Sequence, residues 1–369
     1  MKKLLPIFLV LVLSVVGLVG CQETSEPANN TPAPAPAPAP VEEKPVVEDG
    51  IAKLGLGHLT SIAKSKDLNG DVLPVAQVDT TFIGAGFDKN GKVVKVQIDH
   101  AQQKINFDKD LQITTDLKAP QVTKIELGDG YGMIAASSIG KNWHEQIPEL
   151  EKWMIGKTIE EIKAMKTVER DASHPAVPDE ADLTSLVTIT VEGYIAAIEE
   201  AYNNAVEIPA GATTLGLGHE ISLAKSKSLD AAKNVLPAAQ VDTVLTVSAF
   251  DKDGKVVRTI IDTAQTKVSF DANGKITTDK AGEFKTKIEL GDEYGMIAAS
   301  SIGKNWYQQI AELEKWMAGK KVDEIKAMKT IERDASHPAV PDVAELASLV
   351  TVTVQDYIKV VAESFDNAK

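Results

Sequence analysis

The chain has 369 residues, 43% of them hydrophobic, and a formal net charge of -14 at pH 7. This length is typical of two or more domains, and the hydrophobic fraction is sufficient to form their cores. The negative charge, which no Lys/Arg cluster offsets, excludes nucleic acid as a partner. The single cysteine excludes an intrachain disulfide and a cysteine-based metal site.

The first 20 residues have the pattern of a secretory signal peptide. Lys2 and Lys3 precede an apolar stretch at residues 4–16, which is short for a membrane-spanning helix. The segment then closes with Leu-Val-Gly-Cys21, which resembles the lipobox of bacterial lipoproteins. We therefore expect cleavage after residue 20 and acylation of Cys21. The protein is then lipid-anchored at the extracellular face of the cell membrane.

Residues 21–50 are expected to form a disordered tether. Proline and alanine alternate between residues 31 and 41, a composition that favours polyproline II and cannot build a core. The tether therefore holds the rest of the protein away from the bilayer.

The remaining sequence is a duplication. Residues 124–143 match residues 287–306 at 19 of 20 positions, and residues 162–179 match residues 325–342 at 17 of 18. A repeat of this length indicates a duplicated domain rather than a solenoid unit. We place the two copies at residues 51–206 (copy one) and 211–369 (copy two).

The first half of copy one is expected to be rich in strands. Residues 51–66 are read as either a helix or an irregular lead-in. Alternation in residues 76–87, the turn Asp-Lys-Asn-Gly at residues 88–91 and alternation in residues 92–99 predict a β-hairpin. A further pair of strands is expected at residues 104–107 and 112–115. The turn lacks the spacing of a calcium-binding EF-hand loop.

The second half is expected to be helical. Apolar residues at helical spacing predict a helix over residues 142–154, and a capping box begins another at Thr158. A proline-rich loop at residues 171–179 follows, and a final amphipathic helix begins near Val191. Antiparallel strands followed by helices predict an α+β fold.

A short pattern lies between the loop and the final helix. An acid is followed three residues later by serine and three residues after that by threonine, and both copies contain it: Asp182, Ser185 and Thr188; Glu345, Ser348 and Thr351. On its own this stretch is also consistent with an ordinary β-branched strand.

The order of elements and the Asp-x-x-Ser-x-x-Thr pattern resemble the FMN-binding domain of extracytosolic electron-transfer proteins and of ion-pumping redox complexes. The signature of that family is Asp-x-x-Ser/Thr-Gly-Ala-Thr/Ser, and a flavin transferase attaches FMN to its final hydroxyl through a phosphoester. Here Leu-Val replaces Gly-Ala in both copies, and Glu345 replaces the aspartate in copy two. The lipobox, tether and tandem copies are similar to the pheromone-encoding lipoproteins of Gram-positive extracellular electron transfer.

The resemblance implies two covalently bound FMN groups, at Thr188 and Thr351. It also implies an electron carrier rather than an enzyme with its own substrate, and no catalytic residue is assigned. A membrane NADH dehydrogenase or the quinone pool would be the electron donor, and ferric iron an extracellular acceptor. The alternative is a non-redox surface binding or adhesion lipoprotein. The signal peptide would either yield a peptide pheromone or be degraded.

Residues expected to line the flavin ring occur in both copies: Tyr131, Met133, Trp143 and His174; Tyr294, Met296, Trp306 and His337. Core packing is the alternative role of the tryptophans and methionines, and a loop-locking hydrogen bond that of the histidines. The rival attachment sites are Ser137, Ser138, Ser300 and Ser301. The six histidines show no clustering in the sequence, so no metal site is expected.

Overall fold

The computed structural model describes residues 50–369, so the expectations for the signal peptide, for Cys21 and for the tether up to residue 49 lie outside the described residues. All described residues belong to one compact unit. Within residues 50–369, no helix is both long and apolar enough to cross a membrane. The division into two domains stays a prediction, because both copies contribute to the same unit.

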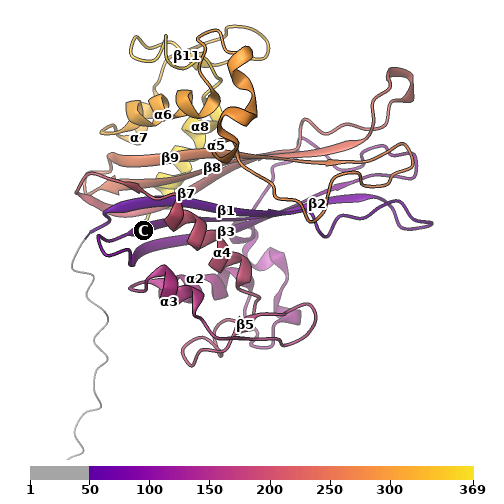
Figure 1. The fold of residues 1–369 in the computed structure, drawn as a ribbon, viewed down its shortest axis with the longest axis horizontal. Coiled ribbons are helices and arrows are strands. Elements are labelled where there is room, and N and C mark those ends of the chain that lie inside the picture. The colour runs from indigo at the N-terminus through magenta and orange to yellow at the C-terminus, as the bar shows by residue number, and fades with distance from the viewer. Residues whose placement is uncertain (1–49) are drawn as a thin grey trace, which may run out of the picture. The chain divides into compact units, whose positions relative to one another are not determined.

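Each copy contains an antiparallel sheet (Figure 1). In copy one the strand order is β3-β2-β1-β6, with bounds β1 (Lys53–Ser61), β2 (Val75–Phe87), β3 (Val93–Asn106) and β6 (Val206–Glu207). In copy two the order is β7-β8-β9, with bounds β7 (Ala212–Ser222), β8 (Ala238–Asp251) and β9 (Val256–Ser269). The predicted hairpin is therefore confirmed as β2 and β3. The expected strand at residues 104–107 is largely the end of β3, and Phe107 pairs with Ile113 as an isolated bridge.

The helices follow the strands in the same order in both copies. The helices of copy one are α1 (Lys124–Leu127), α2 (Trp143–Met154), α3 (Ile159–Lys163) and α4 (Glu192–Asn203). Two short strands, β4 (Thr167–Val168) and β5 (Val177–Pro178), lie between α3 and α4. The corresponding elements of copy two are α5 (Lys287–Leu290), α6 (Trp306–Met317), α7 (Val322–Lys326), β10 (Thr330–Ile331), β11 (Val340–Pro341) and α8 (Gln355–Asp366). Short 3₁₀ turns follow α1 and α5. The fold is thus mixed, with antiparallel sheets and helices.

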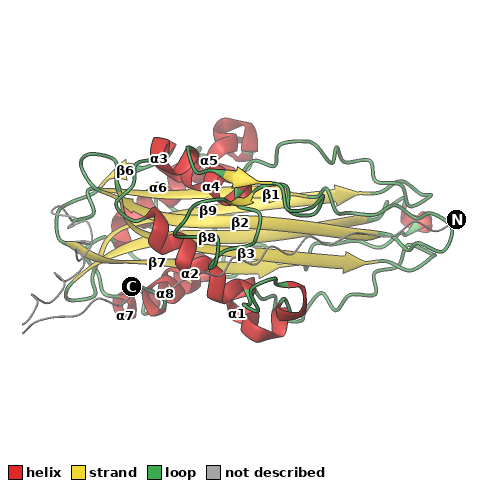
Figure 2. Ribbon diagram, turned by 90° about the horizontal axis from the view of Figure 1, so that it is seen from below, coloured by secondary structure: helices red, strands yellow, loops and turns green. Residues whose placement is uncertain are grey.

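The two sheets pack face to face, with helices on the outer faces (Figures 1 and 2). The central core takes residues from both copies, and the rings of Phe107 and Phe270 lie 5.1 Å apart in it. A Cβ atom at Gly84 would lie 2.6 Å from Val247 Cγ2, which shows how closely β2 approaches β8. Each sheet also forms an outer core with the helices of its own copy. The chain therefore forms four layers, with a helical layer of each copy on opposite sides.

The strand β1 shows that the expectation for residues 51–66 was wrong. A Cβ atom at Gly55 would lie 1.9 Å from the Ala201 carbonyl oxygen, and one at Gly57 would lie 2.0 Å from that of Ala197. Glycine is therefore required where the backbone of α4 lies directly on β1. The sequence pattern is weak because a strand with glycine on one face has no alternation of side chains to read. Copy two has the same close approach of α8 at Gly216 and Gly218.

The helices begin and pack as their residues predict. The Asn142 backbone amide donates to the Glu145 carboxylate at 2.7 Å, at the start of α2. The buried face of α2 includes Trp143, Ile147 and Leu150. Thr158 and the Glu161 side chain form the predicted capping box of α3. That helix ends at Lys163.

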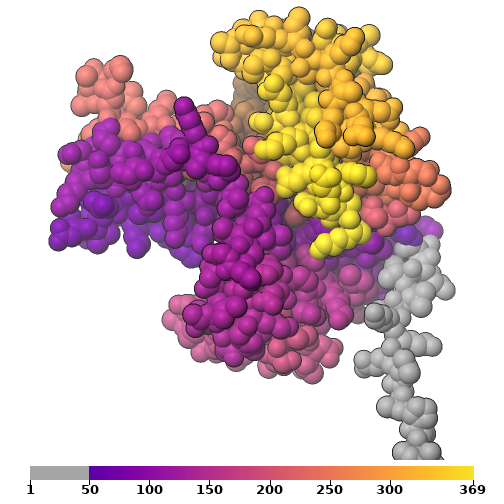
Figure 3. All heavy atoms as spheres, turned by 180° about the vertical axis from the view of Figure 1, so that it is seen from behind, coloured from indigo at the N-terminus to yellow at the C-terminus, as the bar shows by residue number. Residues whose placement is uncertain are grey.

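The C-terminal residues also join the copies. Figure 3 shows this yellow segment extending from the helices of copy two to the surface of copy one. The Gln97 side-chain amide donates to the Asn367 carbonyl at 2.7 Å, and its oxygen accepts from the Leu217 amide at 2.8 Å. These bonds satisfy backbone groups at the edge of the contact between the sheets.

Candidate functional site

The parts of the two copies that are most alike are mainly exposed. Most of residues 124–143 and 162–179 lie at the surface, although each segment differs from its partner at one position only. In contrast, the strand β2 is almost wholly buried, yet it differs from β8 at seven of 13 positions. Packing constrains buried residues, so it does not explain identity at the surface. The near-identical exposed segments therefore define the candidate site.

Residues 182–190, which contain Thr188, form a series of turns rather than a strand. The amides of Leu186 and Val187 both donate to the Leu183 carbonyl at 2.8 Å. Val187 is buried in the outer core, as is Val350 in copy two. Core packing thus accounts for an apolar residue at position 187 and at position 350. Thr188 itself is half-buried, close to the start of α4.

One buried glutamine holds Thr188. The Gln146 side-chain oxygen accepts from the Thr188 amide at 2.8 Å and from the Thr188 hydroxyl at 3.4 Å. The Gln146 side-chain nitrogen donates to the Lys141 carbonyl and to the Ser137 hydroxyl, at 3.0 and 3.4 Å. Both candidate attachment residues, Ser137 and Thr188, therefore meet at Gln146. Copy two repeats the network with Gln309, Ser300, Lys304 and Thr351.

An arginine lies beside the same threonine. The Arg170 guanidinium donates to the Thr188 carbonyl at 3.0 Å and to Asp171 at 3.3 Å. Asp171 also binds His174 Nδ1 at 2.8 Å, and these hydrogen bonds hold the pKa of Asp171 down at about 2. His174 is thus hydrogen-bonded within its loop. The chain has only three arginines, and Arg333 occupies the equivalent position, with Asp334 and His337. Guanidinium groups suit phosphate recognition.

The expected ring-lining residues differ in exposure. Tyr131 and Met133 are half-buried and border the outer core, so they can contact a ligand. Trp143 is buried, and its Nε1 donates to the Tyr194 hydroxyl at 2.9 Å, which gives it a structural contact. The equivalents in copy two are Tyr294, Met296 and Trp306, with Trp306 bonded to Tyr357 at 2.9 Å.

The remaining predicted residues lie at the surface. Asp182 and Ser185 are exposed in the turns before Thr188, as are Glu345 and Ser348 before Thr351. Ser138 and Ser301 are exposed as well. These positions are accessible to a modifying enzyme.

A buried lysine lies beside Tyr131 and Trp143. The Lys124 ammonium is 4.7 Å from the centre of the Tyr131 ring and 5.5 Å from that of Trp143. Burial lowers the pKa of Lys124 to about 8, although Asp79 and Asp99 act in the opposite direction. In copy two, Lys287 has the same contacts with Tyr294 and Trp306 and the same pKa of about 8.

Buried polar atoms without a partner recur around these residues. Buried side-chain atoms of the described residues that lack a hydrogen bond include three equivalent pairs: His100 Nε2 and Thr263 Oγ1, Asn142 Oδ1 and Asn305 Oδ1, Thr190 Oγ1 and Thr353 Oγ1. The two asparagine side chains face the N3 amides of α2 and α6 in capping boxes, so the histidine and threonine atoms carry the argument. Thr263 lies near the Tyr357 hydroxyl but outside hydrogen-bonding geometry. Asn142 precedes Trp143, and the rings of His100 and Trp143 lie 6.4 Å apart. Unsatisfied buried groups are rare, and a ligand would satisfy them.

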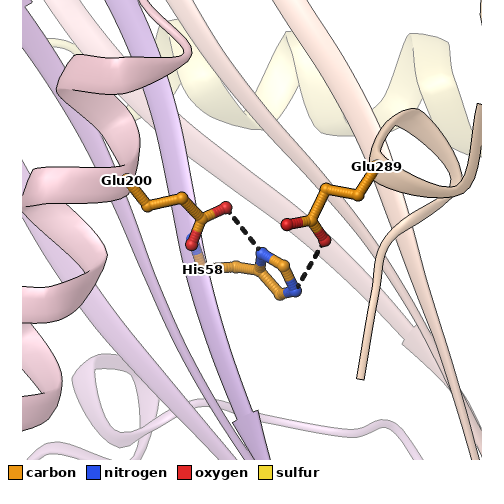
Figure 4. Close-up of side chains that lie close together, drawn as sticks. All are labelled: His58, Glu200 and Glu289. Atoms are coloured by element: carbon orange, nitrogen blue, oxygen red, sulfur yellow. Dashed lines mark hydrogen bonds and ion pairs between the residues drawn. The ribbon is translucent and has the colours of Figure 1, made fainter. Parts of the chain in front are cut away.

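Two histidine clusters join the copies, and the sequence did not reveal either. His58 Nδ1 lies 3.0 Å from Glu200, and its Nε2 lies 3.6 Å from Glu289 of copy two (Figure 4). Burial lowers the pKa of His58, but Glu200 and then Glu289 raise it, and the result is about 9. His219 lies equivalently between Glu126 and Glu363, with a pKa of about 10.

One ligand atom from each of His58, Glu200 and Glu289 lies within 4.8 Å of the others, and the cluster at His219 has the same property. Each imidazole nitrogen of His58 faces a different carboxylate, an arrangement that suits a protonated imidazole. A pKa near 9 also means that a metal would have to displace a proton at neutral pH. The expectation that the protein has no metal site stays a prediction.

The clusters line cavities between the copies. The cavity at His58 has a volume of about 200 Å³, and the cavity at His219 has a volume of about 520 Å³. Neither Thr188 nor Thr351 lines them. The buried carboxylates that line these two cavities have pKa values raised by burial. The pKa is about 6 for Asp99 and Asp262, and about 7 for Glu151 and Glu314.

Comparisons with known proteins add one relative. No family model and no solved structure matches the chain. Over 131 residues the chain is 30% identical to a protein of Desulfitobacterium hafniense named chlorophenol reductase, and this match covers 31% of the chain and 40% of the relative. Similarity to a reductase indicates a redox role. It also contradicts the expectation that the protein is not an enzyme, because the relative is named as one.

Proposed function

We propose that this protein is a flavin-dependent redox protein that carries FMN in each copy. The FMN phosphate is joined to the hydroxyl group of Thr188 in copy one and of Thr351 in copy two, by the action of a flavin transferase. The flavin supplies reversible uptake of electrons. The chain supplies attachment, a positioned phosphate and the surroundings of the ring.

The observation that carries this proposal is the coincidence of three features at one place in each copy. Segments identical between the copies are exposed there, equivalent buried polar atoms lack partners there, and a positioned threonine hydroxyl lies beside an arginine. A surface-binding module without a cofactor accounts for the identity but not for the unsatisfied atoms. The residues present therefore fit a bound group with polar edges and a phosphate.

Each part of the site has a distinct task. The Gln146 oxygen orients the hydroxyl and amide of Thr188, and Arg170 offers charge to the phosphate. Tyr131 and Met133 offer half-buried faces to the ring. An anion near Thr188 also lies near the N-terminal end of α4, where the helix dipole is favourable.

The cellular setting is part of the same proposal. Acylation of Cys21 anchors the protein outside the cell membrane, and a membrane NADH dehydrogenase or the quinone pool supplies electrons. The acceptors are extracellular, with ferric iron as one class. Because the relative is named chlorophenol reductase, we include chlorinated phenols as a second class of electron acceptor.

The test is flavin fluorescence after denaturation. The mature chain is produced with and without a flavin transferase, denatured and separated on a gel. A fluorescent band is expected only with the transferase. Thr188→Ala and Thr351→Ala are each expected to remove about half of the fluorescence, and the double variant all of it. A colourless protein from the transferase strain would rule out the flavin. Fluorescence that survives the double variant would move the attachment elsewhere.

The matched controls are Ser137→Ala and Ser300→Ala. These serines share Gln146 and Gln309 with the threonines, so their variants test the nearest rival hydroxyl groups. Full fluorescence is expected in both. Loss of fluorescence in these variants alone would assign attachment to the serines.

A further inference from the structure

Two buried lysines lack an anionic partner. Lys124 is 9% exposed and Lys287 is 8% exposed, and within residues 50–369 neither ammonium forms an ion pair or a hydrogen bond. Burial of a charge without a counter-charge is unfavourable, and contacts with two aromatic rings offset only part of that cost. The chain could avoid the cost with a neutral residue at these positions, yet both copies retain lysine.

The surroundings of Lys124 do not neutralise it. Asp79 and Asp99 act on it only at a distance, and Lys64 opposes them. Asp79 is engaged by Lys64 at 3.1 Å, while Asp99 accepts from the backbone amides of His100 and Ile125. In copy two, Asp242, Asp262 and Lys225 have the same relation to Lys287. The ammonium is therefore available to a further negative group.

The lysine and the attachment threonine lie at two ends of one row. The Lys124 ammonium lies over the Trp143 ring, Gln146 follows Trp143 by three residues on α2, and Gln146 binds Thr188. One helical turn advances about 5.4 Å. FMN has a ribityl chain between its phosphate and its ring. With the phosphate at Thr188, we therefore assign the ring to the end of the row that holds Tyr131 and Lys124.

We propose that Lys124 and Lys287 are the residues that set the reduction potential of the two flavins, by supplying a positive charge to the reduced ring. The inference rests on the proposed function. An oxidised ring that takes up two electrons and one proton from a reductant gains one negative charge. A nearby ammonium stabilises that charge and therefore favours reduction.

The first test uses one loaded copy at a time. Thr351→Ala removes the second flavin, and Lys124→Met is then compared with Lys124→Arg and with the exposed Lys152→Met as a control for net charge. Flavin loading, read as gel fluorescence, is expected to remain. In Lys124→Met the equilibrium constant for reduction is expected to fall at least tenfold, about 30 mV for a two-electron couple. Lys124→Arg should retain part of the equilibrium constant that Lys124→Met loses. Lys152→Met should leave this constant unchanged.

The second test needs no substitution at the lysine. Because the ammonium is half deprotonated near pH 8, reduction should take up one proton per two electrons below this pH and two above it. The potential of the loaded chain is measured from pH 6 to pH 10. A constant proton stoichiometry, or an unchanged potential in loaded Lys124→Met, would overturn the role of the lysine. Absence of flavin from the unmodified chain would instead overturn the proposed function.

Discussion

Gln146 accepts hydrogen bonds from both the amide and the hydroxyl group of Thr188 through a single oxygen, at 2.8 and 3.4 Å. The two residues are 42 positions apart, and Gln309 and Thr351 repeat the pair. The glutamine thus fixes the orientation of the hydroxyl group that we propose as the attachment point.

Gln146→Ala should therefore reduce flavin attachment in copy one only. The substitution leaves the Thr188 amide without its partner, at a cost of about 1–3 kcal/mol, and frees the hydroxyl group. Total gel fluorescence should fall by up to half, with Thr351 still fully loaded. Gln309→Ala is the matched variant for copy two. Equal loss at both threonines in either single variant would show that the effect is global unfolding.

Arg170→Lys should weaken attachment at Thr188 while leaving the fold intact. Lysine keeps the charge but loses the paired geometry by which guanidinium binds the Thr188 carbonyl and a phosphate. We expect slower loading by the transferase, measured as fluorescence against time, with thermal stability unchanged. Arg333→Lys is the equivalent change in copy two. Normal loading rates in both variants would exclude a role of the arginines in phosphate binding.

The stability of the protein should fall as pH rises from about 6.5 to 8. The folded pKa values of His58 and His219, about 9 and 10, exceed the unfolded value of 6.5. Each histidine therefore contributes stability fully below pH 6.5 and loses it as pH rises through 9 to 10. At about 1.4 kcal/mol per pKa unit, the contribution is on the order of 3 kcal/mol for His58 and about 5 kcal/mol for His219.

Denaturant unfolding at pH 6 to 10 measures this effect. Asp99 and Glu151 line the cavity at His219, and Asp262 and Glu314 line that at His58; their raised pKa values act in the same direction between about pH 4 and pH 7. Lys124 and Lys287 act in the opposite direction above pH 8, because their folded pKa values of about 8 lie below the unfolded value of 10.5. The test therefore concerns the range from pH 7 to pH 8. His58→Gln and His219→Gln should flatten the curve there. A wild-type curve that is already flat between pH 7 and pH 8 would contradict protonated histidines at the contact between the copies.

Gly57→Ala should destabilise the protein by about 1–3 kcal/mol, because overpacking displaces neighbouring groups. Its Cβ atom would lie 2.0 Å from the Ala197 carbonyl, so α4 must move away from β1. Gly130→Ala is a suitable control, because nothing lies within 4 Å of its Cβ position. The free energies of unfolding of the two variants are compared. Similar values for both would show that α4 does not lie directly on β1.

Local patterns predicted much of the fold. Alternation gave β2 and the start of β3, and capping residues with helical spacing gave α2, α3 and α4. Residues 51–66 were misread because Gly55 and Gly57 are there for contact with a helix that lies over 130 residues later. The packing of the two sheets also has no local pattern, because alternation marks the apolar face of a strand but not the sheet or helix that covers it.

The site was only partly predictable for the same reason. The repeated pattern of acid, serine and threonine indicated Thr188. Gln146, which binds Thr188, reads in the sequence as one polar residue of an amphipathic helix. Lys124 likewise reads as a surface lysine until the structure shows it buried, with its ammonium over two aromatic rings. The histidine clusters combine residues separated by up to 231 positions, as for His58 and Glu289, and only tertiary structure brings them together.

The most direct measurement is mass spectrometry of peptides from the protein isolated from its native host. We predict FMN joined by a phosphoester to the peptides that contain Thr188 and Thr351. Fragment ions should place the FMN on the hydroxyl groups of these two threonines. Unmodified threonines, with the flavin absent or on the peptides that contain Ser137 and Ser300, would contradict this prediction.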